Sequence, residues 1–315
     1  MKDLKIVFMG TPDFAVGVLQ HLVENDKNIV AVITAPDRPA GRGRKLQASA
    51  VKQYAESKQI PVLQPTNLKN EDFLTELQSF DANLQIVVAF RMLPKVVWQL
   101  PEYGTFNLHA SLLPEYRGAA PINWALINGE KKTGVTTFFI DEKIDTGEII
   151  FKEEVTIAQR ETVGTLHDRL MDLGSQLVVK TVNAIADETI ATTPQPKTET
   201  FTEAPKLTPE NTKIDWSKSV AQIDALVRGL SPYPVAWCYV EQEDEQFKIK
   251  LYTTEIEHVQ PIESIGTIIT TKKTLKVACK NGYLYIKELQ LPGKRKMDSA
   301  SLLNGFSFQN GAKLT

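Results

Sequence analysis

Apolar runs of strand length alternate with amphipathic segments of helical spacing along the first part of the chain. In order, these runs and segments occupy residues 4–9, 14–23, 28–34, 48–59, 60–63, 71–78 and 84–89. Strands that are apolar throughout are typical of a parallel sheet whose two faces are covered by helices. The pattern therefore predicts a doubly wound α/β fold with a mostly parallel sheet.

The alternation continues and then gives way to a polar stretch. The next predicted elements are a short strand, a helix, two strands and a long amphipathic helix, at residues 104–108, 119–127, 134–140, 148–155 and 162–185. Residues 195–209 are rich in Pro and Thr, a composition typical of a linker. We therefore predict a first domain over residues 1–188 and a linker over residues 189–207.

The remainder of the chain, residues 208–315, has a different pattern. A helical segment precedes five short alternating runs, at residues 220–230, 236–240, 247–254, 266–271, 275–278 and 283–289. Short strands at this spacing favour a small β-barrel. This part is also the more basic one, because residues 206–315 carry a net charge of +3 and residues 1–205 carry −5, giving −2 in total.

Several classes of protein are excluded by what the sequence lacks. No apolar run approaches the roughly 20 residues that span a bilayer, and the N-terminus runs into a strand without a signal peptide, so we expect a cytoplasmic protein. Cys238 and Cys279 are too few for a disulfide framework or a zinc site. The turn after the first strand offers only Gly10 and the distant Gly17, which excludes a dinucleotide site, and the chain has no ATP-binding P-loop.

Candidate chemistry lies at the end of the strand at residues 104–108. Asn107 and His109 are two residues apart, so they project from one face of an extended chain. An amide can donate to a developing oxyanion and an imidazole can transfer a proton, which suits acyl transfer. No serine lies in a Gly-x-Ser-x-Gly turn and no cysteine is near His109, which favours direct transfer. The alternative is a structural histidine beside a turn asparagine.

The string from His109 to Gly118, His-Ala-Ser-Leu-Leu-Pro-Glu-Tyr-Arg-Gly, resembles the signature of the 10-formyltetrahydrofolate-dependent formyltransferases. That family has an Asn, a His and an Asp at its reaction centre, and the matching residues are Asn107, His109 and Asp145, the last in an Asp-Thr-Gly string. The resemblance further implies that the folate would be lined by Ser111, Leu112, Leu113 and Pro114. An isolated Asp before Thr-Gly would otherwise be a turn-forming residue.

A second string, Pro-Asp-Arg-Pro-Ala-Gly-Arg-Gly at residues 36–43, lies in a predicted loop over residues 35–45. It resembles the insertion of the methionyl-tRNA formyltransferases, which implies that it would approach the acceptor end of tRNA, with Arg42 as the leading contact. The implied tRNA-binding residues are Arg38, Arg42, Arg44 and Lys45. The alternative is a solvated surface loop.

The second domain carries the same resemblance. Its strings Lys-Leu-Thr-Pro-Glu, Ile-Asp-Trp-Ser and Arg-Gly-Leu-Ser-Pro-Tyr-Pro are similar to those of the methionyl-tRNA formyltransferases, whose second domain is an OB-like β-barrel that binds tRNA. Its basic side chains could follow a phosphate backbone or could be ordinary solvated strand faces. They are Lys248, Lys250, Lys272, Lys273, Lys276, Lys294, Arg295 and Lys296.

The resemblance implies a function. A formyl group would pass from 10-formyltetrahydrofolate to the free α-amine of methionyl initiator tRNA, by direct amine attack through a tetrahedral intermediate and without a metal. Asn107 and His109 would donate to the oxyanion, while Asp145 would orient His109 and accept the proton of the amine. We expect the protein to act as a monomer.

Two alternatives and one departure from the family pattern accompany this prediction. The chain could instead formylate the amine of a sugar nucleotide, or it could be a tRNA-binding protein without catalytic activity. Arg91 stands where many members of the family have Gly, beside the pterin ring of the folate. Its side chain should therefore point away from that ring.

Overall fold

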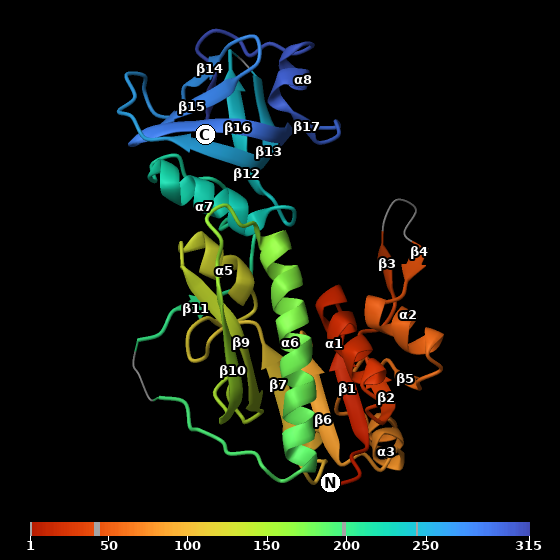
Figure 1. The fold of residues 1–315 in the computed structure, drawn as a ribbon. Coiled ribbons are helices and arrows are strands. Elements are labelled where there is room, and N and C mark those ends of the chain that lie inside the picture. Colours follow the sequence, from red (N-terminus) through yellow and green to blue (C-terminus); the bar gives the residue numbers. More distant parts are fainter. Residues whose placement is uncertain (1, 41–44, 197–199, 244) are drawn as a thin grey trace. The chain divides into compact units, whose positions relative to one another are not determined.

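The computed structural model describes residues 2–40, 45–196, 200–243 and 245–315 (Figure 1). In the first part of the chain the elements are β1 (Ile6–Gly10), α1 (Asp13–Glu24), β2 (Ile29–Ile33), β3 (Arg38–Ala40), β4 (Lys45–Gln47), α2 (Ala50–Ser57), β5 (Val62–Leu63), α3 (Glu71–Ser79), β6 (Leu84–Val88), α4 (Lys95–Trp98) and β7 (Thr105–His109). They are followed by β8 (Arg117–Gly118), α5 (Pro121–Ile127), β9 (Lys132–Phe139), β10 (Ile149–Thr156), α6 (Val163–Ala186) and β11 (Glu203–Ala204).

The remaining elements are α7 (Val220–Leu230), β12 (Ala236–Gln242), β13 (Glu245–Glu257), β14 (Ile268–Thr270), β15 (Leu275–Cys279), β16 (Gly282–Gln290), β17 (Met297–Asp298), α8 (Ser299–Leu303) and β18 (Lys313–Leu314). Within the described ranges, no helix combines the length and the apolar character that crossing a membrane requires.

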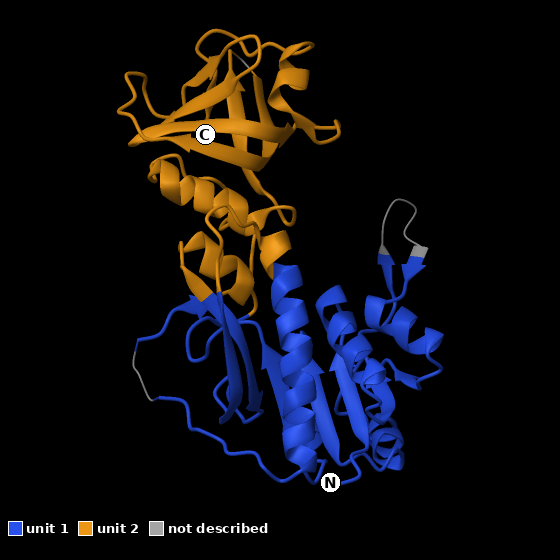
Figure 2. Cartoon of the chain, in the orientation of Figure 1, with its two compact units in different colours: residues 1–118, 133–155, 167–203 blue, residues 119–132, 156–166, 204–315 orange. Residues whose placement is uncertain are grey.

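The chain divides into two compact units that are not continuous in sequence (Figure 2). Unit 1 comprises residues 1–118, 133–155 and 167–203, and unit 2 comprises residues 119–132, 156–166 and 204–315. The predicted first domain, residues 1–188, differs from unit 1 because two of its segments are counted with the C-terminal part of the chain. Sequence patterns could not reveal this division. Helix α5, in residues 119–132, follows the alternation of the first part of the chain, and residues 156–166 include the start of α6, whose remainder belongs to unit 1.

Hydrogen bonds within unit 2 explain why it includes these two segments. From residues 156–166, Arg160 lies 2.8 Å from the carboxylate of Asp224, which is 2% exposed and also accepts hydrogen bonds from Arg228 and Thr254 at 2.8 Å. From residues 119–132, Asn123 donates to the carbonyl of Gly229 at 2.8 Å. A buried carboxylate with three donors is satisfied only when all of its partners are in place.

The sheet of unit 1 has the strand order β10-β9-β7-β6-β1-β2-β5 (Figure 1). Strands β5, β2, β1, β6 and β7 are parallel to one another, and β9 is antiparallel to β7. All five residues of β1 and of β6 are buried, as expected for strands covered on both faces. The predicted doubly wound, mostly parallel sheet is confirmed.

The segment predicted as a loop over residues 35–45 contains strand β3 and the first residue of strand β4. Strands β3 and β4 form an antiparallel ribbon in which Arg38 lies opposite Gln47 and Pro39 opposite Leu46. At its base, Asp37 is paired with Lys52 at 2.7 Å and accepts a hydrogen bond from Gln64, also at 2.7 Å. The prediction of a loop was wrong because long-range anchors, and not local propensity, hold the two sides of the ribbon together.

Unit 2 is built around an antiparallel sheet of order β14-β15-β16-β13-β12-β18. An isolated bridge between Thr267 and Lys313 connects the two ends of this order, so the sheet is nearly closed. Helix α7 begins with a capping box in which Ser219 and Gln222 exchange hydrogen bonds, and it packs Ile223 and Val227 into the core of the sheet. The predicted barrel, consistent with an OB-like domain, is confirmed.

Candidate active site

Strand β7 carries two candidate catalytic residues, Asn107 and His109 (Figure 1). It lies between β6, to which it is parallel, and β9, where Asn107 is opposite Phe138 and His109 is opposite Thr136. His109 is the last residue of the strand, so the imidazole lies at the carboxyl end of the sheet, where ligands bind in open α/β folds. The sequence predicted this position correctly.

The ring of His109 is buried, with 7% of the residue exposed, and one of its nitrogens already has a partner. Nε2 lies 2.8 Å from the carbonyl oxygen of Tyr116. A carbonyl oxygen only accepts, so Nε2 carries a hydrogen and donates it. Tyr116 has φ of 60°, and this left-handed turn directs its carbonyl back toward the end of β7. Nδ1 is therefore the nitrogen that remains for chemistry.

Asp145 approaches that nitrogen from the loop between β9 and β10. Its Oδ2 lies 3.8 Å from Nδ1 of His109 and accepts a hydrogen bond from the backbone N–H of Gly118 at 3.0 Å. The distance of 3.8 Å is too long for a hydrogen bond, so Tyr116 and not Asp145 holds the ring in this structure. Asp145 has φ of 55°, a left-handed conformation that Asp tolerates better than most residues and that recurs at functional sites.

Asn107 has a polar atom without a partner. Its Oδ1 is buried, and no hydrogen-bond donor reaches it among the described residues. A buried acceptor left unsatisfied costs about 1–3 kcal/mol, so such an atom calls for an explanation. Beside His109 and Asp145, this oxygen is an acceptor available to a ligand.

The turn after β7 contains the four residues that the sequence assigned to the folate. Ser111 and Leu113 are fully buried, whereas Leu112 and Pro114 are half-buried. Ser111 donates to the carbonyl of Glu115 at 2.6 Å, and the side chain of Leu113 packs with Phe138 and Ile149. Leu112 and Pro114 are thus the two whose side chains reach the surface.

Of the residues predicted to bind tRNA, the structure describes Arg38 and the backbone of Lys45, both in the β3–β4 ribbon. Arg38 is exposed. Arg42 and Arg44 lie outside the described residues.

Arg91 points to a neighbouring turn. Its guanidinium donates to the carbonyl of Thr66 at 3.1 Å and to the carbonyl of Pro65. Partial burial and the nearby charge of Arg38 lower the pKa of Arg91. A cation can therefore stand at a position where the family pattern has Gly, because two backbone carbonyls hold its side chain.

Gln195 belongs to the site but was not identified from the sequence. It is 9% exposed, and its amide donates to the carbonyls of Asp145 and Gly147, both at 2.9 Å. Its Oε1 accepts from Arg117 at 2.6 Å. Gln195 therefore holds the loop that carries Asp145, although it lies in the predicted linker. No local signal distinguishes it, since its partners are about fifty residues away.

Metal ligands do not gather at this site or elsewhere in the described ranges: no group of three or more His, Cys, Asp or Glu side chains is placed to hold an ion. The donors and acceptors at the site are an amide, an imidazole and one carboxylate. This set suits proton transfer and the stabilisation of a developing oxyanion.

Comparison with known proteins adds two family matches. Residues 4–182 match the model of the formyl transferase family, and residues 206–307 match that of the formyl transferase C-terminal domain. The chain is 55% identical over 314 residues to a methionyl-tRNA formyltransferase of Flavobacterium johnsoniae, covering 100% of both chains. It is 50% identical to one of Bacteroides thetaiotaomicron, covering 99% of both.

Solved structures share the fold at low sequence identity. An N-formyltransferase from Helicobacter canadensis, solved with folinic acid and dTDP-3-aminofucose, superposes with a TM-score of 0.63 at 19% identity, covering 93% of this chain and 100% of that one. HypX from Aquifex aeolicus in complex with tetrahydrofolic acid has a TM-score of 0.64 at 16% identity, covering 96% of this chain and 47% of that one.

Proposed function

The chain belongs to the formyl transferase family and, within it, to the methionyl-tRNA formyltransferases, and from this membership we propose that it transfers a formyl group from 10-formyltetrahydrofolate to the α-amine of methionyl initiator tRNA. The observation that carries the proposal is the 55% identity over the full length of a relative with that name. When bound, the folate supplies the activated formyl group, and it would lie along Leu112 and Pro114, whose side chains reach the surface.

The free atoms of Asn107 and His109 support this chemistry. Because Nε2 of His109 donates to Tyr116, Nδ1 is the atom that would take a proton from the amine and, once protonated, donate toward the formyl oxygen. As the bond between the formyl carbon and the amine forms and the bond to the folate nitrogen breaks, that proton would pass to the leaving nitrogen of tetrahydrofolate. The unpaired Oδ1 of Asn107 would accept a hydrogen bond from the attacking amine, while the side-chain NH2 of the same residue would donate to the formyl oxygen. His109 and the Oδ1 atom of Asn107 are buried, so their electrostatic effect would be stronger than in water.

Asp145 would act beside the imidazole. Its carboxylate lies 3.8 Å from Nδ1 of His109 and would stabilise the imidazolium that forms on proton transfer. A proton could reach Asp145 through one bridging water, since the gap is longer than a direct hydrogen bond. The bond from Gly118 N–H fixes the carboxylate in this position.

Recognition of tRNA is assigned to the β3–β4 ribbon and to the barrel. Arg38 is exposed on the ribbon, whose base is held by the pair between Asp37 and Lys52. The barrel adds basic side chains on its strands. The expectation of a cytoplasmic monomer stays a prediction.

The test mixes the purified protein with 10-formyltetrahydrofolate and methionyl initiator tRNA, with free methionine and an amino-sugar nucleotide as parallel acceptors. Formylated product on the tRNA alone is expected. Product on the sugar alone would refute the proposed acceptor, and tight tRNA binding with no product would leave only a binding protein.

Variants then test the residue roles. His109→Ala, Asn107→Ala and Asp145→Asn should each lower the rate by on the order of 10²–10⁴-fold, the usual range for proton-transfer and oxyanion groups. His258→Ala is the matched control, because His258 is exposed in unit 2. A near-normal rate for His109→Ala would overturn the mechanism.

A further inference from the structure

Two neighbouring strands of the barrel in unit 2 bring cations and aromatic rings to one face. In the antiparallel pair of β12 and β13, Trp237 lies opposite Lys250 and Tyr239 lies opposite Lys248. Residues two apart on a strand share a face, so all four side chains project together. A parallel bridge adds Lys213, whose Nζ lies 5.8 Å from the ring of Trp237 and 5.3 Å from that of Tyr239.

The ammonium groups on this face lack carboxylate partners. Within the part of the chain that the structure describes, no Asp or Glu lies within salt-bridge distance of Lys213, Lys248 or Lys250. By contrast, three other lysines of the barrel are paired at 3.0–3.6 Å: Lys276 with Glu257, Lys287 with Glu255 and Lys296 with Glu288. Of the predicted basic residues of the barrel, Lys276 and Lys296 are therefore neutralised, whereas Lys248 and Lys250 are free to bind an anion.

Lys248 is held in place by an aromatic ring. Its Nζ lies 3.5 Å from the centre of the indole of Trp237, a cation–π contact. Desolvation and the neighbouring charge of Lys250 lower the pKa of Lys248. An anion between these two ammonium groups would relieve their repulsion.

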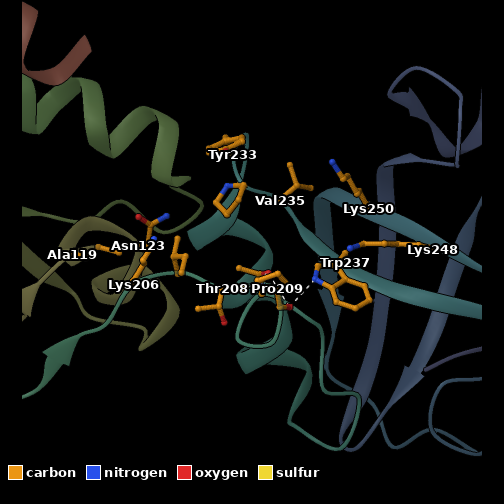
Figure 3. A pocket seen from close by; sticks show the side chains of 14 residues that line it. Ala119, Asn123, Lys206, Thr208, Pro209, Tyr233, Val235, Trp237, Lys248 and Lys250 are labelled. Atoms are coloured by element: carbon orange, nitrogen blue, oxygen red, sulfur yellow. Dashed lines mark hydrogen bonds between the residues drawn. The ribbon is translucent and has the colours of Figure 1, made fainter. Parts of the chain in front are cut away.

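A pocket of about 500 Å³ opens beside this face, and all of its lining residues belong to unit 2 (Figure 3). Trp237, Lys248 and Lys250 line it together with Tyr233, which is 81% exposed. The indole N–H of Trp237 donates to the carbonyl of Pro209 at 3.0 Å, which fixes the ring. We call this the Trp237 pocket.

The wall of the Trp237 pocket also contains a strained residue. Val235 has φ of 79°, and the left-handed region is unfavourable for a β-branched side chain. Its backbone N–H donates to the carbonyl of Leu230 at 2.9 Å. Such strain persists only where the surrounding structure enforces it, and it concentrates at binding sites.

A nucleotide matches these features. Its phosphate needs cations, and its base needs a flat aromatic surface, which together are the elements of single-strand recognition. The volume lies within the range of small-ligand sites. Lys248 already covers one face of Trp237, so the exposed ring of Tyr233 is the surface left for a base.

We propose that the Trp237 pocket holds one unpaired nucleotide of the substrate tRNA, with the phosphate between Lys248 and Lys250 and the base against Tyr233. This inference rests on the proposed function for the identity of the RNA. A free mononucleotide has the same chemistry, and the experiment includes it as a separate arm.

The test measures the affinity of the full chain for methionyl initiator tRNA between 50 and 300 mM salt. In the double variant Lys248→Gln/Lys250→Gln, the slope of log Kd against log salt should fall by about 0.7–1.4, the value for one or two phosphate contacts on a single strand. Affinity near physiological salt should fall on the order of tenfold. The KM for methionyl-tRNA should rise with it, whereas the KM for the formyl donor should not change.

Matched variants separate this result from a general loss of charge or of fold. Lys287→Gln, in the pair with Glu255, should leave the slope unchanged. Tyr233→Ala should weaken tRNA binding on the order of tenfold, as expected for a lost stacking contact, and Tyr233→Phe should restore it.

Three outcomes would overturn the inference. In the first, the Lys248/Lys250 variant has the same salt slope as the Lys287 variant. In the second, Tyr233→Phe is as weak as Tyr233→Ala. In the third, millimolar adenosine monophosphate binds the wild-type protein but not the double variant and leaves the affinity for tRNA unchanged, which would assign the pocket to a free nucleotide. If the wild-type protein binds tRNA without formylating it, the proposed function fails. The salt slope of the double variant would still show whether the Trp237 pocket binds a phosphate of the tRNA.

Discussion

Replacement of Gly147 by alanine would test how precisely the loop that carries Asp145 must be positioned. A Cβ built at residue 147 would lie 1.7 Å from the carbonyl oxygen of Phe139 and 2.8 Å from its carbonyl carbon. Phe139 is the last residue of β9, and its backbone N–H donates to Glu148 at 3.0 Å, so this backbone cannot move aside freely. Since Cβ atoms do not approach within 3.0 Å, the loop must shift by at least about 1.3 Å.

A shift of this size would reach the candidate catalytic carboxylate. Asp145 is two residues away, and its bond from Gly118 is 3.0 Å long, so a displacement of more than 1 Å breaks it. The two bonds from Gln195 to the carbonyls of this loop would break as well. A misplacement of about 1 Å can cost on the order of 10² in rate. We expect kcat to fall by about that factor, with both KM values within about threefold.

The assay is formylation of methionyl initiator tRNA at saturating concentrations of both substrates, with circular dichroism and urea unfolding to establish that the variant is folded. The matched control is Gly305→Ala, because a Cβ at Gly305 has no neighbour within 4 Å and its φ is not in the left-handed range. A folded Gly147→Ala protein with kcat within threefold of wild type would refute the reasoning.

Three further predictions concern buried groups of both units. Leu113→Ala should lower the free energy of unfolding by about 2–5 kcal/mol, because the side chain is 0% exposed. Urea denaturation would measure this loss. An equal loss in Leu46→Ala, at a residue that is 73% exposed, would contradict the prediction. Gln195→Ala removes three hydrogen bonds and should lower the free energy of unfolding by about 2–4 kcal/mol, with lower kcat. An unfolding free energy within about 0.5 kcal/mol of wild type would show that these bonds do not hold the loop. Burial raises the pKa of Cys279 from 9.0 to about 12. The thiol of the unfolded chain therefore ionises first, and the free energy of unfolding should fall as the pH rises between these two values. Cys279→Ala should weaken this pH dependence, and identical curves of unfolding free energy against pH for the two proteins would argue against it.

The spacing of Asn107 and His109 predicted their common position at the end of a strand, and the structure has both in β7. This succeeded because a strand alternates its side chains every two residues and because Pro114 and Gly118 stop the strand nearby. Their proposed partnership with Asp145 came from the resemblance to a family and not from spacing. The distance of 3.8 Å between Asp145 and His109 is known only from the fold.

Other features could not be predicted from local pattern. Gln195 looked like one polar residue in a linker, but it is buried against two carbonyls of the loop that carries Asp145. The β3–β4 ribbon looked like a loop, because Asp37 at its base is paired with Lys52, and Lys52 lies outside the predicted loop. The strand pattern also could not show that Arg160 would be tied to Asp224, a contact that helps define unit 2.

The sequence by itself determined the kind and order of the main elements, the apolar strands of the first sheet, the short strands of the barrel and the strings that mark the family. These depend on neighbours within a few residues, through periodicity, caps and turns. The tertiary structure alone decided which nitrogen of His109 is free, which lysines of the barrel have a carboxylate partner, and which part of the linker supports the candidate active site. Each of these is a pairing between polar groups, several of them far apart in sequence, and burial makes such a pairing specific only after the chain has folded.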